Sequence, residues 1–196
     1  DRLPGSGNSN YRLTVTFDAS TSGVEFEPNE SISAANEITS GTSVLGSIGD
    51  PDDEDWYSIT VSSAGTLTVL MDQVVASYEG FVVDVQDGSG EILGRFICDY
   101  GTDCHSSEGT RVVTGLAASG TYYVKVSSES STSAPGDGDG SYRLTATFST
   151  DTEGVEFEPN GSRSTANEIS SGKPVLGSIG DSSGEDWYSI TVSSAG

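Results

Sequence analysis

Positive charge is what this sequence most lacks. The 196 residues include 8 Lys+Arg against 30 Asp+Glu, which gives a formal net charge of -22. A surface of this sign repels nucleic acid and anionic membranes and attracts cations. Long apolar runs are also missing, since none approaches the roughly 18 residues of a membrane-spanning helix. We therefore expect no nucleic-acid partner and no membrane insertion.

Histidine is nearly absent, because His105 is the only one in the chain. A Ser–His–Asp triad therefore cannot be assembled in each of the two related segments described below. Paired carboxylates are numerous and would suit a glycosidase, but nothing in the sequence distinguishes one acid from the others. We expect a protein that is not an enzyme.

Cysteine is limited to Cys98 and Cys104, in a loop rich in Gly, Asp and Ser. A zinc site with His105 as third ligand has too few ligands and no second cysteine pair. A disulfide that closes a short loop is the favoured interpretation. Because disulfides persist in oxidising compartments, it predicts a secreted or cell-surface protein.

An internal repeat organises the chain. Residues 23–65 return as residues 154–196, with 34 of 43 positions identical and a constant offset of 131. The same offset relates NYRLTVTF at residues 10–17 to SYRLTATF at residues 141–148. A unit of this length can bury a core of its own. We predict three parts: the last strand of a preceding repeat plus a linker (1–22), a complete repeat (23–153), and the first half of the next repeat (154–196), which needs a partner or its missing remainder.

Apolar–polar alternation, interrupted by Gly- and Ser-rich turns, recurs along the complete repeat. An extended arm stiffened by Pro28 is expected at residues 25–30, and residues 31–38 allow one helical turn. Without a convincing long helix, the pattern predicts an all-β, antiparallel β-sandwich or jelly-roll-like domain, tandemly repeated. Strands are predicted at residues 44–48, 56–61, 66–71, 80–86, 92–98, 111–116, 121–127 and 142–148.

Acidic side chains gather in two segments of the repeat: the arm at residues 25–30 and the turn just before the strand at 56–61. In the arm, Glu25, Glu27 and Asn29 alternate and point to one side of an extended chain. Neither segment contains Lys or Arg, and crowded carboxylates raise one another's energy unless a positive charge lies between them. Oxygen ligands in irregular backbone suit Ca²⁺ better than Mg²⁺. From the residues alone, a calcium site and a solvated acidic turn both remain open. The turn before the strand at 56–61 supplies Asp50, Asp52, Asp53 and Asp55.

The arm and the turn, EFEPNES…AA…G…VLGSI…DDEDWYSITV, resemble the bacterial pre-peptidase C-terminal domain family and the related collagen-binding domains of clostridial collagenases. Those are β-sandwich modules attached to secreted proteases and other exported proteins. The resemblance covers the 131-residue unit, including the closing G-x-Y strands near Gly120 and Gly140. In the collagen-binding relatives the arm and turn bind calcium. The resemblance therefore implies a Ca²⁺ site made of Glu25, Glu27, Asn29, Glu30, Asp52, Asp53 and Asp55, with Glu30 where the family usually has Asp or Asn.

The second copy of the arm and turn departs from this pattern. By the same resemblance its metal ligands are Glu156, Glu158, Asn160 and Asp186. Its remaining acids are lost, so we predict weaker calcium binding at the second site. The lost acids are Glu30, replaced by Gly161, Asp52, replaced by Ser183, and Asp53, replaced by Gly184.

Asn29 and Asn160 also begin N-glycosylation sequons, Asn-Glu-Ser and Asn-Gly-Ser. An asparagine that holds a metal is not free to carry a glycan. Ligation is therefore favoured over glycosylation at both positions.

Two functions of different class are compatible with these features. The first is a non-catalytic, calcium-stabilised repeat of a stalk, adhesin or extracellular fibre, partnered by neighbouring repeats or by identical chains through strand complementation into a filament. The second is an accessory module of a secreted hydrolase that binds a collagen-like or polysaccharide ligand of the extracellular matrix. An exposed aromatic row on one sheet would favour the second. Its candidates are Tyr78, Phe81, Phe96, Tyr100, Tyr122 and Tyr123.

Overall fold

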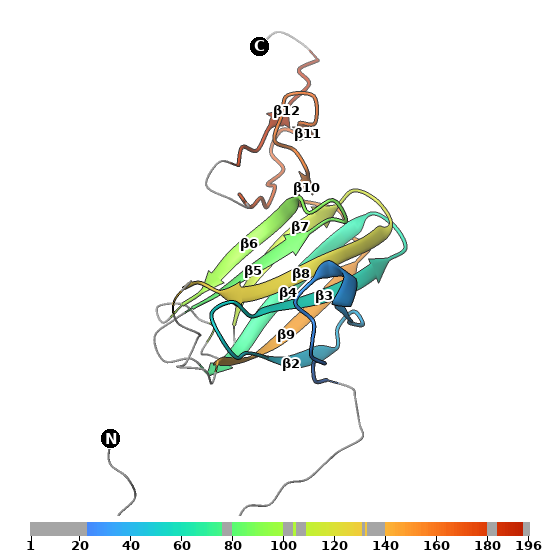
Figure 1. Cartoon of the computed structure of the whole chain (residues 1–196). Coiled ribbons are helices and arrows are strands. Elements are labelled where there is room, and N and C mark those ends of the chain that lie inside the picture. Colours follow the sequence, from blue (N-terminus) through green and yellow to red (C-terminus); the bar gives the residue numbers. More distant parts are fainter. Residues whose placement is uncertain are drawn as a thin grey trace, which may run out of the picture.

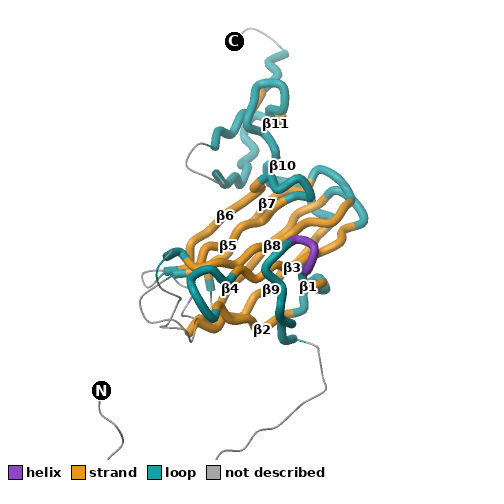
Figure 2. The backbone as a smooth tube through the Cα atoms, in the orientation of Figure 1, coloured by secondary structure: helices purple, strands orange, loops and turns teal. Residues whose placement is uncertain are grey.

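The computed structural model describes residues 23–75, 80–99, 104, 109–130, 132, 140–179 and 184–193. Strands dominate these ranges, and helical structure is limited to 3-10 turns, of which η1 at Ile32–Ala34 lies wholly within them (Figure 2). No helix in the described ranges is long and apolar enough to cross a membrane. The strand predicted at residues 10–17 and the residues His105, Tyr78 and Tyr100 lie outside the described part of the chain.

The predicted all-β class is confirmed, and all eight predicted strands are present with shifts of one or two residues at most ends. The fourth strand differs most, since it continues four residues beyond the predicted end. The long strands are β2 (Ser43–Ile48), β3 (Glu54–Val61), β4 (Gly65–Val75), β5 (Phe81–Gln86), β6 (Ile92–Cys98), β7 (Thr110–Leu116), β8 (Gly120–Ser128) and β9 (Gly140–Ser149). Short strands are β1 (Asn36–Glu37), β10 (Phe157–Glu158), β11 (Asn167–Glu168) and β12 (Tyr188–Ser189).

Two five-stranded sheets form the layers of a sandwich (Figure 1). One has the order β1-β3-β8-β5-β6 and the other β10-β7-β4-β9-β2. The long strands pair antiparallel, as predicted. Parallel pairing among the described strands is confined to the two-residue strands: β1 with β3, β10 with β7, and β11 with β12. The sheets are therefore mixed at their edges.

Alternation along the strands builds the core between the two layers. In β3, Tyr57, Ile59 and Val61 are buried on one face, as their spacing predicts. The other strands contribute in the same way, so a continuous apolar cluster fills the sandwich. Members from the central strands are Leu67, Val69 and Met71 of β4, Phe81 and Val83 of β5, Val124 and Val126 of β8, and Leu144 and Ala146 of β9.

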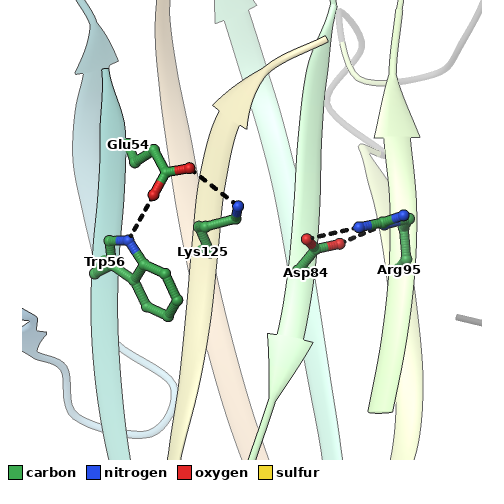
Figure 3. A network of polar contacts seen from close by, with 5 residues as sticks. All are labelled: Glu54, Trp56, Asp84, Arg95 and Lys125. Atoms are coloured by element: carbon green, nitrogen blue, oxygen red, sulfur yellow. Dashed lines mark hydrogen bonds and ion pairs between the residues drawn. The ribbon is translucent and has the colours of Figure 1, made fainter. Parts of the chain in front are cut away.

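Basic side chains on the outer face of the β3–β8–β5–β6 sheet are committed to ion pairs (Figure 3). Arg95 contacts the nearly buried carboxylate of Asp84 through two bonds of 2.5 and 2.9 Å. Lys125 lies 3.1 Å from Glu54, which also accepts a hydrogen bond from the indole of Trp56 at 3.1 Å. These cations are therefore unavailable to the acidic segments.

The disulfide predicted between Cys98 and Cys104 is present, with the two Cα atoms 5.7 Å apart. Both residues are buried and belong to the core cluster. The bridge therefore ties the end of β6 into the sandwich.

The second copy repeats the local pairing of the first. Val155 bridges Leu176 in parallel, as Val24 bridges Leu45 131 residues earlier. The register of β11 with β12 is likewise that of β1 with β3. The arm and the short strand after it therefore pair in the same way in both copies.

The two copies differ in how their apolar faces are covered. Ile48, Ile59 and Val61 of the first copy are at most 4% exposed, because the sandwich closes over them. Their counterparts in the second copy lie on an uncovered face. The exposed fractions are 59% for Ile179, 53% for Ile190 and 74% for Val192.

A strand addition joins the second copy to the first, at the upper end of the sandwich in Figure 1. Strand β10 pairs in parallel with β7, with Phe157 opposite Gly115. The Gly115 N–H donates to the Glu156 carbonyl at 3.0 Å. A Cβ at Gly115 would lie 2.1 Å from that carbonyl oxygen, so the close approach requires glycine.

Candidate metal centres

The arm of the first copy is held by backbone pairing on one side and by an asparagine on the other. The Glu25 N–H donates to the Leu45 carbonyl at 3.0 Å, which aligns the arm with the edge of β2. The side chain of Asn36 satisfies both backbone groups of Phe26, at 2.6 and 3.0 Å. Further along, the Trp56 N–H donates to the Asn29 carbonyl at 3.0 Å. The arm is thus seated against the start of β3.

Two tyrosines orient carboxylates of the first cluster, which consists of Glu25, Glu27 and Asp55 with Asn29. Glu25 accepts hydrogen bonds from the Ser47 N–H and the Tyr57 hydroxyl, each at 2.6 Å. The hydroxyls of Tyr57 and Tyr142 lie 2.7 Å apart. Tyr142 donates to Asp55, which is fully buried. The tyrosine pair therefore fixes one oxygen of each acid, and the Ser47 N–H holds the second oxygen of Glu25.

Carboxylate oxygens of Glu25, Glu27 and Asp55 lie within 4.8 Å of one another. The fully buried side chain of Asn29 completes the group. Its amide lies 2.9 Å from Glu27 and 3.2 Å from Asp55, and with the nitrogen on that side it donates a hydrogen bond to each carboxylate. One neutral amide does not compensate the charge of three crowded carboxylates, so the group needs protons or a cation between its oxygens.

The electrostatics of the first cluster reflect this crowding. Burial raises the pKa of Asp55 to about 9, and the charges of Glu25 and Asp53 add to that rise. Burial also raises the pKa of Glu27, again with support from neighbouring acids. No salt bridge among the described residues reaches the cluster. In the absence of a cation, protons must therefore take up part of the negative charge.

The remaining predicted ligands of the first copy lie beside this cluster. Glu30, Asp52 and Asp53 line an open hollow of about 450 Å³ next to Glu27. Asp53 accepts a hydrogen bond from the Gly49 N–H at 2.6 Å, which holds the turn. The structure thus gathers Glu25, Glu27, Asn29 and Asp55 at one point and arranges the other three acids along its rim.

The second copy builds the same core of ligands. Oxygens of Glu156, Glu158 and Asp186 lie within 4.8 Å of one another. Glu156 accepts hydrogen bonds from the Tyr188 hydroxyl and the Ser178 N–H, as Glu25 does from Tyr57 and Ser47. Burial raises the pKa of Glu158 to about 7, and the charges of Glu156, Asp186 and Glu91 raise it further.

Asn160 marks an unsatisfied position in this second cluster. Its side chain is fully buried, and its amide nitrogen donates to Glu156 at 3.1 Å. Its Oδ1 atom has no hydrogen-bond partner among the described residues. A buried acceptor without a donor is rare in folded proteins and points to a missing partner.

Sequence reasoning missed the tyrosines and one acid. Tyr57 and Tyr142 were predicted only as strand residues, although Tyr142 belongs to a closing G-x-Y strand that could have flagged it. Glu91, on the first copy, lines a hollow with Glu158 and Asp186 of the second copy. No local pattern in the sequence singles out Glu91.

No protein-family model matches the sequence, and no curated protein matches it. Among solved structures, the chain is similar to the pre-peptidase C-terminal domain of a collagenase from Bacillus anthracis. The identity is 23%, over 63% of this chain and 100% of that chain, with a TM-score of 0.42. It is also similar to a family 6 carbohydrate-binding module, at 14% identity over 58% of this chain and 71% of that one, with a TM-score of 0.27. At these identities and scores the matches assign no activity to this chain.

Proposed function

We propose that this chain is a non-catalytic, calcium-stabilised tandem repeat of a secreted or cell-surface protein, which acts as a stalk, adhesin or extracellular fibre. One observation carries the proposal. Carboxylate oxygens of Glu25, Glu27 and Asp55 converge within 4.8 Å of one another beside the buried Asn29, and no salt bridge among the described residues reaches them. A cation at that point satisfies all three.

The donor set favours calcium. It contains only oxygens, from three carboxylates and one amide, and these come from an irregular arm and the start of β3. Ca²⁺ takes 6–8 oxygen ligands at about 2.3–2.6 Å in flexible geometry, whereas Mg²⁺ demands a tighter octahedron. Glu25, Glu27, Asn29 and Asp55 would hold the ion, and solvent or the rim acids would complete its shell. The ion would neutralise the cluster and fasten the arm to the sandwich.

A structural role is supported by the repeat and by the joint. Two copies of the arm and turn occur in one chain, and the second adds a strand to the sheet of the first. The disulfide between Cys98 and Cys104 supports an oxidising, extracellular setting. Identical chains or neighbouring repeats are the proposed partners, because the uncovered apolar face of the second copy needs further strands to cover it.

Thermal unfolding of the 196-residue chain tests the calcium part of the proposal. At a Ca²⁺ concentration of about 100 times the dissociation constant, binding stabilises the folded state by about 2.7 kcal/mol. That corresponds to a rise in the midpoint of about 5–10 °C over the same protein in chelator. Mg²⁺ at equal concentration serves as the control and should give a much smaller rise. Equal midpoints in Ca²⁺ and chelator would contradict the proposal.

The accessory-module hypothesis gains less support from the described residues. Of its aromatic candidates, Phe81, Phe96 and Tyr122 are buried, and Tyr123 is half-buried. None of these four is exposed as a carbohydrate platform requires. A pull-down against collagen, chitin and cellulose distinguishes the two functions, since a stalk repeat should bind none of them.

A further inference from the structure

The hollow beside the second cluster lies at the joint between the two copies. Its walls come from both: Glu91 and Ile92 from the first copy, and a set of residues around the second cluster. The members from the second copy are Glu158, Pro159, Gly161, Ser162, Thr165, Gly184, Glu185 and Asp186. The second cluster therefore opens onto the preceding repeat.

Glu91 is held at this position by a tight turn between β5 and β6. The side chain of Asp87 accepts hydrogen bonds from the N–H groups of Ser89 and Glu91, at 2.8 and 3.0 Å. Gly90 adopts a positive φ of 88°, which closes the turn. The Asp87 N–H donates to the Glu91 carbonyl at 3.0 Å. The backbone that carries the Glu91 carboxylate is thus fixed by contacts within the first copy alone.

The second copy lacks two acids at positions that line the same hollow as Glu91. Gly161 and Gly184 stand in place of Glu30 and Asp53, and both glycines line the shared hollow. In the first copy, Glu30 and Asp53 line the corresponding hollow. The glycines carry no side chain into this hollow, and Glu91 of the neighbouring repeat lines it with them.

The second cluster also contains a buried polar atom without a hydrogen-bond partner. The Oδ1 atom of Asn160 is buried and has no partner among the described residues, while its Nδ2 contacts Glu156 of the cluster.

We propose that Glu91 of one repeat completes the cation site of the next, in place of the acids lost at Gly161 and Gly184. This inference rests on the proposed calcium function and adds to it a composite site shared across the joint. Because the site is built only when β10 is docked on β7, cation binding and docking stabilise each other. The ion then acts as a clamp between consecutive repeats.

Calcium titration calorimetry on the 196-residue chain tests this assignment. Glu27→Gln and Glu158→Gln identify the binding events of the first and second clusters. Glu91→Gln should weaken the calcium affinity of the second cluster about tenfold, because it removes one charge close to a divalent ion. The calcium affinity of the first cluster should stay within about twofold. Glu37→Gln removes an equal charge at the exposed edge strand β1 and should change neither.

A rescue variant separates ligation from a merely structural effect. Gly161 has no positive φ, and a Cβ there meets nothing closer than 3.5 Å, so a side chain fits. Adding Gly161→Glu to Glu91→Gln restores a local acid and should recover most of the lost affinity. A structural role for Glu91 would give no such recovery.

The outcomes are distinct. If Glu91→Gln binds calcium at the second cluster as tightly as Glu37→Gln does, the composite site is wrong and the proposed calcium function stands. If the unmodified chain binds calcium at neither cluster, both are wrong. Gly115→Ala, which displaces β10 but keeps the Glu91 carboxylate, should also weaken the second event, and unchanged affinity in that variant would overturn the shared site.

Discussion

Gly115→Ala tests the joint between the two copies most directly. Gly115 lies on β7 where β10 of the second copy pairs with it. Its N–H donates to the Glu156 carbonyl at 3.0 Å, and an added methyl would lie 2.1 Å from that oxygen and 3.0 Å from the Phe157 ring. The two strands must separate by about 1 Å to remove the overlap, and such a shift breaks the hydrogen bond.

The cost follows from the contacts that are lost. One backbone hydrogen bond contributes about 1 kcal/mol, and the partial exposure of the Phe157 ring adds about as much again. Destabilisation of the docked joint by about 2 kcal/mol corresponds to an opening constant about thirtyfold larger. The first sandwich should be unaffected, because β7 keeps its full ladder with β4.

Native-state hydrogen exchange measures this opening constant. The amide at position 115 and those of residues 155–158 and 160 should exchange about thirtyfold faster in Gly115→Ala, while β4 amides keep their protection. Gly120→Ala is a matched control on β8, because its methyl would meet nothing closer than 3.9 Å. Equal exchange in the Gly115→Ala and Gly120→Ala variants would refute the close-approach argument.

Two further predictions concern charge. Asp55→Asn should raise the unfolding midpoint in chelator and abolish most of the calcium increment in calorimetry. Burial and neighbouring acids raise the pKa of Asp55 to about 9 from its ordinary 3.8, so the stability of the unmodified chain in chelator should fall as pH rises between these values. The Asp55→Asn variant should flatten that fall. A lower midpoint for the variant than for the unmodified chain in chelator would contradict this prediction. In urea unfolding, Arg95→Ala should cost about 3 kcal/mol, since it leaves Asp84 buried and unpaired. Lys125→Ala should cost at most about 1 kcal/mol, because its partner Glu54 is 38% exposed, and equal costs would contradict this reasoning.

The strands were predictable because their physical cause is local. Burial of alternate residues requires a period of two, and β3 shows it in Tyr57, Ile59 and Val61. Gly- and Ser-rich turns placed the ends of most strands within two residues. The loop between Cys98 and Cys104 was short enough for its chemistry to predict the disulfide that the structure contains.

The arrangement of the acids was only partly predictable. The alternation of Glu25, Glu27 and Asn29 indicated one shared side, and the structure brings them to Asp55. The turn residues Asp52 and Asp53 were assigned as ligands by the family resemblance, and the structure places them along the adjoining hollow. Which acids of a turn face inward depends on where the turn meets the sheet, and that is set by tertiary packing.

Contacts between distant segments could not be paired from the local pattern. Tyr142 reaches Asp55 across 87 positions, from β9 on the opposite sheet. Glu91 meets the second copy only because β10 adds to the edge of β7. Both depend on the order of strands in the two sheets, which alternation alone does not determine.

Burial of the two sequon asparagines bears on how the protein can be made. Asn29 and Asn160 have no exposed surface once the arms are seated. An oligosaccharide transferred to either one during synthesis would occupy the place of the folded arm and hold it away from the sheet. Eukaryotic secretory expression should therefore yield misassembled material, and replacing Ser31 and Ser162 with alanine would remove both acceptor sequences while keeping the buried amides.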